Sequence, residues 1–155
     1  MLTAKGALPW LKRRGGVITA ISTLGAHTAY PTYVAIGSSK AALEALIRYI
    51  AFEWAKYGVR ANSVAAGPVD TRAIDWFRHP EAVRIFTAKK GLAGRMGMPH
   101  DIADIATWLC TDESRWIIGQ SILAEAGLLL GVDYDAWMDE NVDRADVVTT
   151  AGGAS

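Results

Sequence analysis

The sequence predicts an α/β fold in which helices cover a parallel sheet. Segments rich in β-branched residues alternate with helical repeats along 155 residues, about one domain's worth of chain. Such alternation is typical of parallel sheets, because parallel neighbours need a crossover between them. Hydrophobic residues make up 51% of the chain, charged residues 21%, and 16 basic residues balance 16 acidic ones. This composition excludes a disordered chain and offers no basic excess for nucleic acid or a membrane surface.

The chain opens with a helical segment and a first strand. Residues 1–14 are expected to form the end of a helix that Pro9 interrupts, since proline lacks the N–H of an interior helical position. Two glycines then stop the helix. Residues 17–21 (V-I-T-A-I) form a short apolar run of the kind found in buried parallel strands. A loop is expected from residue 22 to about residue 32.

The strongest helical pattern follows that loop. Its apolar residues recur at helical spacing and would form one buried face: Leu43, Leu46, Ile47, Ile50 and Trp54. Gly58 suits the end of this helix, because glycine readily adopts the left-handed backbone found there. Residues 59–65 predict a second strand, which Gly67-Pro68 terminates.

Three further segments complete the pattern. Residues 69–98 predict a long irregular loop, residues 99–111 a helix, and residues 119–124 a third strand. We expect one domain over residues 1–130 and a C-terminal tail over residues 131–155. Four chemically notable residues are expected to be structural or inert: Asn62 bridging backbone groups in a strand, Cys110 buried on a helix, and His27 and His79 at the surface without metal-ligand spacing.

Ligands of parallel sheets bind beyond the carboxyl ends of the strands, here about residues 22–23, 66–67 and 125–126. Close to the first of these ends, Tyr33 and Lys40 are seven residues apart, about two helical turns, so they would share a helix face. A phenol and an ammonium that face one ligand suit proton donation and stabilisation of an oxyanion. The alternative is a packed aromatic residue beside a solvated lysine.

Five motifs occur in a fixed order along the chain. They read G-G-V-I-T-A-I-S-T, S-K-A-A-L-E-A-L, V-R-A-N-S-V-A-A-G-P-V-D-T, G-R-M-G-M-P-H-D-I-A and G-Q-S-I-L-A-E-A-G. As a set they resemble the C-terminal half of a short-chain dehydrogenase/reductase, over residues 2–130. The resemblance implies a Rossmann-like parallel sheet with flanking helices that is incomplete, because it comprises only the C-terminal half of the doubly wound domain.

The spacing between the tyrosine and the lysine resembles that of one branch of this superfamily. The common family pattern places the catalytic tyrosine four residues before the lysine, where this chain has Ile36. The Tyr-x6-Lys spacing of Tyr33 and Lys40 is instead similar to that of the enoyl-acyl carrier protein reductases, particularly the NADPH-using bacterial kind. The resemblance implies that Tyr33 hydrogen-bonds the substrate's thioester carbonyl and that Lys40 holds the nicotinamide ribose. Thr23 stands in the place of a family serine.

The resemblance also implies a cofactor turn and a substrate pocket. Four residues of the turn would hold the nicotinamide amide and a phosphate: Gly67, Pro68, Val69 and Thr71. Residues 72 to about 92 match the segment that covers the substrate, and four of them would line an acyl-chain pocket: Ile74, Trp76, Phe77 and Phe86. Ordinary amphipathic packing is an equal alternative for those four. Glu125-Ala126-Gly127 replaces the family's Asp-Gly-Gly, which is a mild departure.

No glycine-rich dinucleotide fingerprint occurs before residue 17. The first strand should therefore have an unpaired edge, and exposed apolar surface should favour a homo-oligomer or a completing chain.

Three functions stay open. The first is reduction of 2-enoyl thioesters of acyl carrier protein or coenzyme A, with NADPH or NADH, in cytoplasmic fatty acid biosynthesis. The second is a 3-oxoacyl reductase or alcohol dehydrogenase of the same superfamily, which Ile36 disfavours. The third is a catalytically inactive fragment that acts only by association.

Overall fold

The computed structural model describes residues 2–130. Its helices are α1 (Leu2–Arg14), α2 (Val34–Trp54), α3 (Pro80–Lys90) and α4 (Pro99–Leu109), and its strands are β1 (Gly16–Thr23), β2 (Val59–Ala66) and β3 (Ser121–Ala124). Four short 3-10 turns connect them: η1 (Leu24–Ala26), η2 (Ala55–Tyr57), η3 (Ile74–Trp76) and η4 (Asp112–Ser114). The expected tail, residues 131–155, lies outside the described residues. Within residues 2–130 no helix combines the length and apolar character that crossing a bilayer requires.

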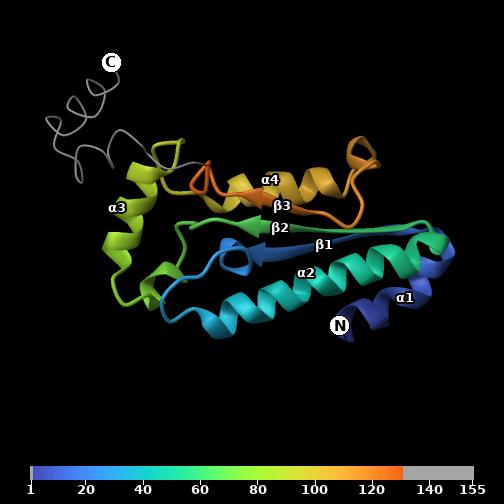
Figure 1. Ribbon diagram of the computed structural model, residues 1–155. Helices are drawn as coiled ribbons and strands as arrows, with labels where there is room; N and C mark the ends of the chain where they lie inside the picture. The colour runs from blue at the N-terminus through green and yellow to red at the C-terminus, as the bar shows by residue number, and fades with distance from the viewer. Residues whose placement is uncertain (1, 131–155) are drawn as a thin grey trace, which may run out of the picture.

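The three strands form one parallel sheet in the order β1-β2-β3. Thr23 pairs with Ala66, and Ala66 pairs with Ala124, so all three strands end at the same edge. In Figure 1, α1 and α2 lie on one side of the sheet, α4 lies on the other, and α3 lies beyond the carboxyl ends of the strands. The predicted helix-covered parallel sheet is confirmed.

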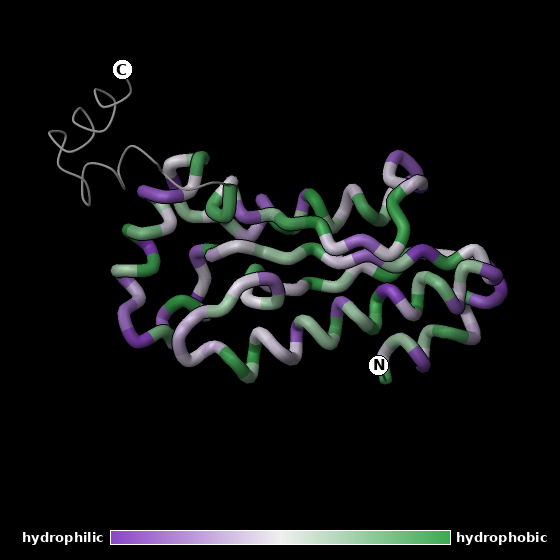
Figure 2. Tube along the Cα trace, in the orientation of Figure 1, coloured by the Kyte–Doolittle hydropathy of each residue, from purple (hydrophilic) through white to green (hydrophobic). Residues whose placement is uncertain are grey.

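The hydrophobic core lies on both faces of the central strand. On the α2 face the buried residues are Ile47, Ile50, Ala51, Trp54, Val59 and Ala61, and on the α4 face they are Val64, Ile102 and Leu109. Figure 2 shows the matching pattern on α2, where hydrophobic and hydrophilic positions alternate from turn to turn. The Asn62 side chain donates to the carbonyl of Ile117 at 2.8 Å and accepts from the N–H of Gln120 at 3.0 Å, which confirms its structural role.

The outer edge of β1 is open. Within residues 2–130 no strand pairs with that edge, whereas β2 is flanked on both sides. Five of the eight residues of β1 are half-buried and only one is buried, although six of the eight residues of β2 are buried. This difference is the expected signature of a parallel strand that lacks one neighbour.

The prediction of a long irregular loop over residues 69–98 was wrong, because that stretch contains α3. The helix carries ordinary end signals, with Pro80 in its first turn, Glu81 near its positive end and Lys89 and Lys90 in its last turn. Its only buried residue is Thr87. The helix α3 therefore has no buried apolar stripe, and the periodicity of its hydrophobic residues did not indicate a helix.

Two smaller expectations also fail. Pro9 does not interrupt α1, which continues to Arg14; Leu8 and Leu11 pack against the core, and these contacts compensate for the missing hydrogen bond. Cys110 is exposed rather than buried, because α4 ends at Leu109 and Cys110 is its C-cap.

Candidate active site

Tyr33 lies at the carboxyl end of β1, directly before the first turn of α2. Its phenol oxygen is 3.4 Å from the hydroxyl oxygen of Thr23, the last residue of β1. Its ring stacks on Phe77, with centroids 5.8 Å apart, and meets the edge of Tyr30 at 6.2 Å. The phenol is therefore held by aromatic packing from two segments and directed towards a second hydroxyl.

The backbone before Tyr33 is strained. Thr32 has a φ of 64°, in the left-handed region that β-branched residues rarely adopt. Strain of this kind persists only where surrounding contacts impose it, and such residues cluster at functional sites. The position of Tyr33 is thus imposed by tertiary packing and does not follow from local propensity.

Two glycines allow close packing beside Tyr33, one against its ring and one against the backbone of the first. A Cβ added to Gly25 would lie 2.5 Å from Cε1 of Tyr33, and a Cβ added to Gly37 would lie 2.6 Å from the carbonyl oxygen of Gly25. Neither glycine was predicted from the sequence as part of the site. The available signal was Gly37 inside a long helix, where glycine is destabilising by about 1 kcal/mol and needs a packing reason.

Lys40 reaches the same strand end from the second turn of α2. Its ammonium donates a hydrogen bond to the carbonyl oxygen of Ile21 at 2.8 Å, two residues before Thr23. The structure thus brings the three predicted catalytic residues, Thr23, Tyr33 and Lys40, to one end of β1. The arrangement offers two hydroxyl groups and one cation to a ligand lying above that end.

The predicted cofactor turn follows β2. The N–H of Gly67 donates to the carbonyl of Ala124 at 2.9 Å, and a Cβ on Gly67 would lie 2.8 Å from Cα of Glu125, so this position requires glycine. A cavity of about 360 Å³ lies between this turn, the end of β3 and α4, lined by Val69, Arg95 and Ile105 among others. Thr23, Tyr33 and Lys40 do not line it, so the cavity lies beside the predicted catalytic residues rather than over them.

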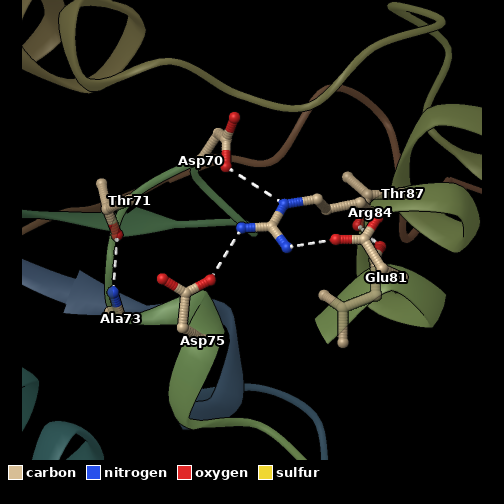
Figure 3. A network of polar contacts seen from close by, with 8 residues as sticks. Asp70, Thr71, Ala73, Asp75, Glu81, Arg84 and Thr87 are labelled. Atoms are coloured by element: carbon tan, nitrogen blue, oxygen red, sulfur yellow. Dashed lines mark hydrogen bonds and ion pairs between the residues drawn. The ribbon is translucent and has the colours of Figure 1, made fainter. Parts of the chain in front are cut away.

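Arg84 of α3 joins the cofactor turn to the predicted substrate segment. Its guanidinium lies 2.9 Å from Asp75, 3.3 Å from Asp70 and 2.8 Å from Glu81, as Figure 3 shows. The hydrogen bond with Asp75, together with Asp70 and Glu81, raises the pKa of Arg84 above its usual value. Asp70 immediately precedes Thr71, so Arg84 ties this turn to α3. Arg84 was not predicted from the sequence, because only its pairing with Glu81 is local.

The four predicted pocket residues are placed differently. Phe77 stacks on Tyr33, and Ile74 is buried with an exposed fraction of 4%. Trp76 is 90% exposed and Phe86 is 51% exposed. Of the four, Phe77 is the one that stacks on a predicted catalytic residue.

Tyr30 is a further residue of the site, and it was not predicted from the sequence. Burial, the carboxylate of Glu125 and the neighbouring Tyr33 together raise the pKa of Tyr30 above its usual value. The Tyr30 phenol therefore keeps its proton to higher pH than an ordinary tyrosine. Glu125 belongs to the segment after β3, so residues from the ends of β1 and β3 converge here.

Residues 1–129 match the family model described as enoyl-(acyl carrier protein) reductase. The chain belongs to this family, within the short-chain dehydrogenases/reductases. The enoyl reductase resemblance seen in the Tyr-x6-Lys spacing is thereby confirmed at the level of the family.

Three relatives illustrate the range of this enoyl reductase family and its superfamily. The 1-cyclohexenylcarbonyl-CoA reductase of Streptomyces collinus is 35% identical over 76% of the chain and 43% of its own length. The NADH-dependent enoyl-[acyl-carrier-protein] reductase of Aquifex aeolicus is 36% identical over 81% of the chain and 47% of its own length. The crystal structure of the Aquifex enzyme aligns with a TM-score of 0.75, covering 82% of this chain and 49% of that one at 34% identity. The 7alpha-hydroxysteroid dehydrogenase of Escherichia coli is 32% identical over 75% of the chain and 45% of its own length.

The chain spans about half the length of the relatives that it matches. The expected half-sheet and the open edge of β1 agree with that share.

Proposed function

We propose that this chain is the catalytic half of a reductase of 2-enoyl thioesters that uses NADH or NADPH. The observation that carries the proposal is the placement of Tyr33 beside Thr23, with Lys40 at the same strand end. The position that holds tyrosine in the common superfamily pattern is Ile36, which has no acid–base chemistry. Tyr33 is therefore the candidate acid–base group, and the hydroxyl of Thr23 lies beside its phenol.

The chemistry follows from the groups present. The phenol of Tyr33 donates a hydrogen bond to the thioester carbonyl oxygen, with Thr23 as its neighbour. A bound nicotinamide supplies the hydride that adds to the β-carbon of the enoyl group. The electron pair of the double bond then moves towards the carbonyl oxygen, where the phenol stabilises the enolate charge. A proton from water then adds to the α-carbon, so that one hydride and one proton have been added across the double bond.

The donors at the strand ends fit a nicotinamide ribose and its amide. Lys40 offers an ammonium for ribose hydroxyls, and its hydrogen bond to Ile21 keeps it at the end of β1. The turn of Gly67, Pro68 and Val69 offers backbone groups, since Gly67 brings the main chain close to β3. Thr71 adds a hydroxyl beyond the turn.

The open edge of β1 supports a partner as part of this proposal. Parallel strands are normally paired on both sides, so a nucleotide-binding unit on this or another chain, or a homo-oligomer, would cover the edge. Tyr49 and Phe52 are 66% and 85% exposed on α2 and offer an apolar surface for association. The proposal places the reaction in cytoplasmic fatty acid synthesis, with the acyl group carried by acyl carrier protein or coenzyme A.

A second candidate is reduction of a carbonyl or oxidation of an alcohol. The similarity to a hydroxysteroid dehydrogenase favours it, and Ile36 opposes it.

One comparison separates the two. The full protein that contains this chain is assayed with NADPH and NADH against crotonyl-CoA and acetoacetyl-CoA under matched conditions. Faster turnover of the enoyl thioester supports the proposal, and faster turnover of the 3-oxo thioester favours the second candidate. Binding of either nicotinamide is followed in parallel by the fluorescence of the six tryptophans. If the purified chain alone binds neither nucleotide, a further nucleotide-binding unit is needed to form the cofactor site.

A further inference from the structure

Glu44 is a buried carboxylate that the proposed reaction does not use. It lies on α2, four residues after Lys40, and only 4% of it is exposed. The hydroxyl of Ser22 donates a hydrogen bond to one carboxylate oxygen at 2.5 Å. Nε2 of His27 lies 3.0 Å from the other oxygen. His27 is at the surface as expected, but its ring also faces inwards to Glu44.

The two partners of Glu44 lie at opposite ends of one turn. Ser22 immediately precedes Thr23, and His27 closes η1 by donating its backbone N–H to the carbonyl of Leu24 at 2.9 Å. Residues 22–27, here called the β1 turn, are therefore fastened to α2 at both ends by one side chain. Between residues 2 and 130, Glu44 is the one side chain that forms hydrogen bonds with both ends.

The β1 turn also carries the contacts that locate Tyr33. The Thr23 hydroxyl accepts a hydrogen bond from the N–H of Gly25 at 3.4 Å and lies 3.4 Å from the Tyr33 phenol. Gly25 has no side chain and lies against the Tyr33 ring, so a shift of the turn would move both contacts. Glu44 is thus connected to Tyr33 through two short paths.

A carboxylate is an unfavourable choice for this position unless its hydrogen bonds are needed. Burial of a charge is destabilising without partners, and an apolar side chain would fill the same space without losing hydration. What the carboxylate adds is two strong acceptors with fixed directions. Both of them are directed at the β1 turn.

We propose that Glu44 is a positioning residue for Tyr33. By holding Ser22 and His27, it fixes the β1 turn and thereby the distance between the Thr23 hydroxyl and the Tyr33 phenol. Its importance for turnover rests on the proposed function of Tyr33. Its effect on the geometry does not, and that effect is measurable without any activity.

The test follows the Tyr33 ring by NMR. The 155-residue chain is labelled with ¹³Cζ-tyrosine, which gives one resonance for each of five tyrosines, and the Tyr33 signal is assigned by its loss in Tyr33→Phe. Glu44→Ala is expected to shift the Tyr33 resonance by more than its line width. Glu44→Gln keeps an acceptor for Ser22 and a donor for His27, so its resonance is expected to return towards the parent position. Glu53→Gln, at an exposed position of the same helix, is the matched control and is expected to leave the resonance in place.

Folded Glu44→Ala protein with an unchanged Tyr33 resonance overturns the proposal, because the residue is then merely structural. If Glu44→Ala does not fold, the Tyr33 resonance is measured in Ser22→Ala and His27→Ala instead. An unmoved Tyr33 resonance in both variants overturns the proposal.

In the full protein that contains this chain, Glu44→Ala is expected to lower kcat about 10- to 100-fold, with little change in the KM for the nicotinamide. Absence of turnover in the parent itself would count against the proposed function, and the NMR result would still decide the role of Glu44.

Discussion

The hydroxyl of Thr23 and the phenol of Tyr33 lie 3.4 Å apart, although a turn of nine residues separates them in the chain. Thr23 is the last residue of β1, and Tyr33 directly precedes α2. Their side-chain oxygens are within hydrogen-bonding distance of each other. A ligand oxygen above β1 can therefore meet both groups at once. Phe77 behind the ring of Tyr33 limits the directions in which that ring can move.

Adding one methyl group to Gly25 tests how tightly Tyr33 is held. In Gly25→Ala the new Cβ would lie 2.5 Å from Cε1 of Tyr33, so the ring or the turn must shift. We expect a loss of about 1–3 kcal/mol in the free energy of unfolding, and a shifted Tyr33 resonance. Gly6→Ala is the matched control, because nothing lies within 4 Å of its Cβ, and it should stabilise α1 by about 0.5–1 kcal/mol. Parental stability and an unmoved Tyr33 in Gly25→Ala would refute this packing.

Ala126 stands where the family has glycine, and the backbone shows the consequence. Its φ is 56°, in the left-handed region that disfavours any side chain. Ala126→Gly is expected to raise the free energy of unfolding by about 0.5–1 kcal/mol, measured by urea denaturation. The same change at Ala42, exposed on α2, should lower it by about 1 kcal/mol. If both variants changed the free energy of unfolding in the same direction, the backbone at Ala126 would not be strained.

Arg60 secures the end of α4. Its guanidinium donates to the carbonyls of Leu109, Thr111 and Ser114 at 3.3, 2.9 and 3.1 Å. Arg60→Ala removes one charged donor from each carbonyl, although the Ser114 hydroxyl and the N–H of Ile117 still donate to them. We expect a loss of about 2 kcal/mol in unfolding free energy. Arg60→Lys should recover only part of it, because one ammonium lacks the planar fork. A lysine variant as stable as the parent would show that charge alone suffices.

Asp101 links stability to acid pH. The guanidinium of Arg95, with the N–H of Met98, holds the pKa of Asp101 well below its usual range. A depressed pKa in the folded state stabilises the fold above the unfolded value of about 4, and this stability is lost as the pH falls below it. Asp101→Asn should therefore lower the melting temperature at pH 7 and flatten its fall below about pH 4. Asp104→Asn, exposed on the same helix, is the control; an identical acid profile for Asp101→Asn and the parent would exclude this linkage.

The sequence was sufficient to predict the elements with apolar patterns. α2 was predictable because Ile47, Ile50 and Trp54 recur at helical spacing and are buried. The helix α3 was not, because it is held by polar contacts of Arg84 with Asp70 and Asp75 and not by an apolar stripe.

The site was predictable in its reactive residues and not in its supports. Tyr33 and Lys40 were identified from their spacing and from a family resemblance. Gly25 and Glu44 were not, because Gly25 matters only where the Tyr33 ring folds back on it. Glu44 acts on partners 17 and 22 residues away, which only the tertiary fold brings to it.

The central claim is that Tyr33 is the group that polarises the thioester carbonyl. The most direct measurement is the rate of nicotinamide oxidation with crotonyl-CoA by the full protein that contains this chain, for the parent, Tyr33→Phe and Tyr57→Phe. Tyr57 is the control because it lies in η2, at the opposite end of the sheet. The account predicts at least a ~100-fold loss of turnover in Tyr33→Phe, with the cofactor Kd little changed, and near-parental turnover in Tyr57→Phe. Parental turnover in Tyr33→Phe would contradict it.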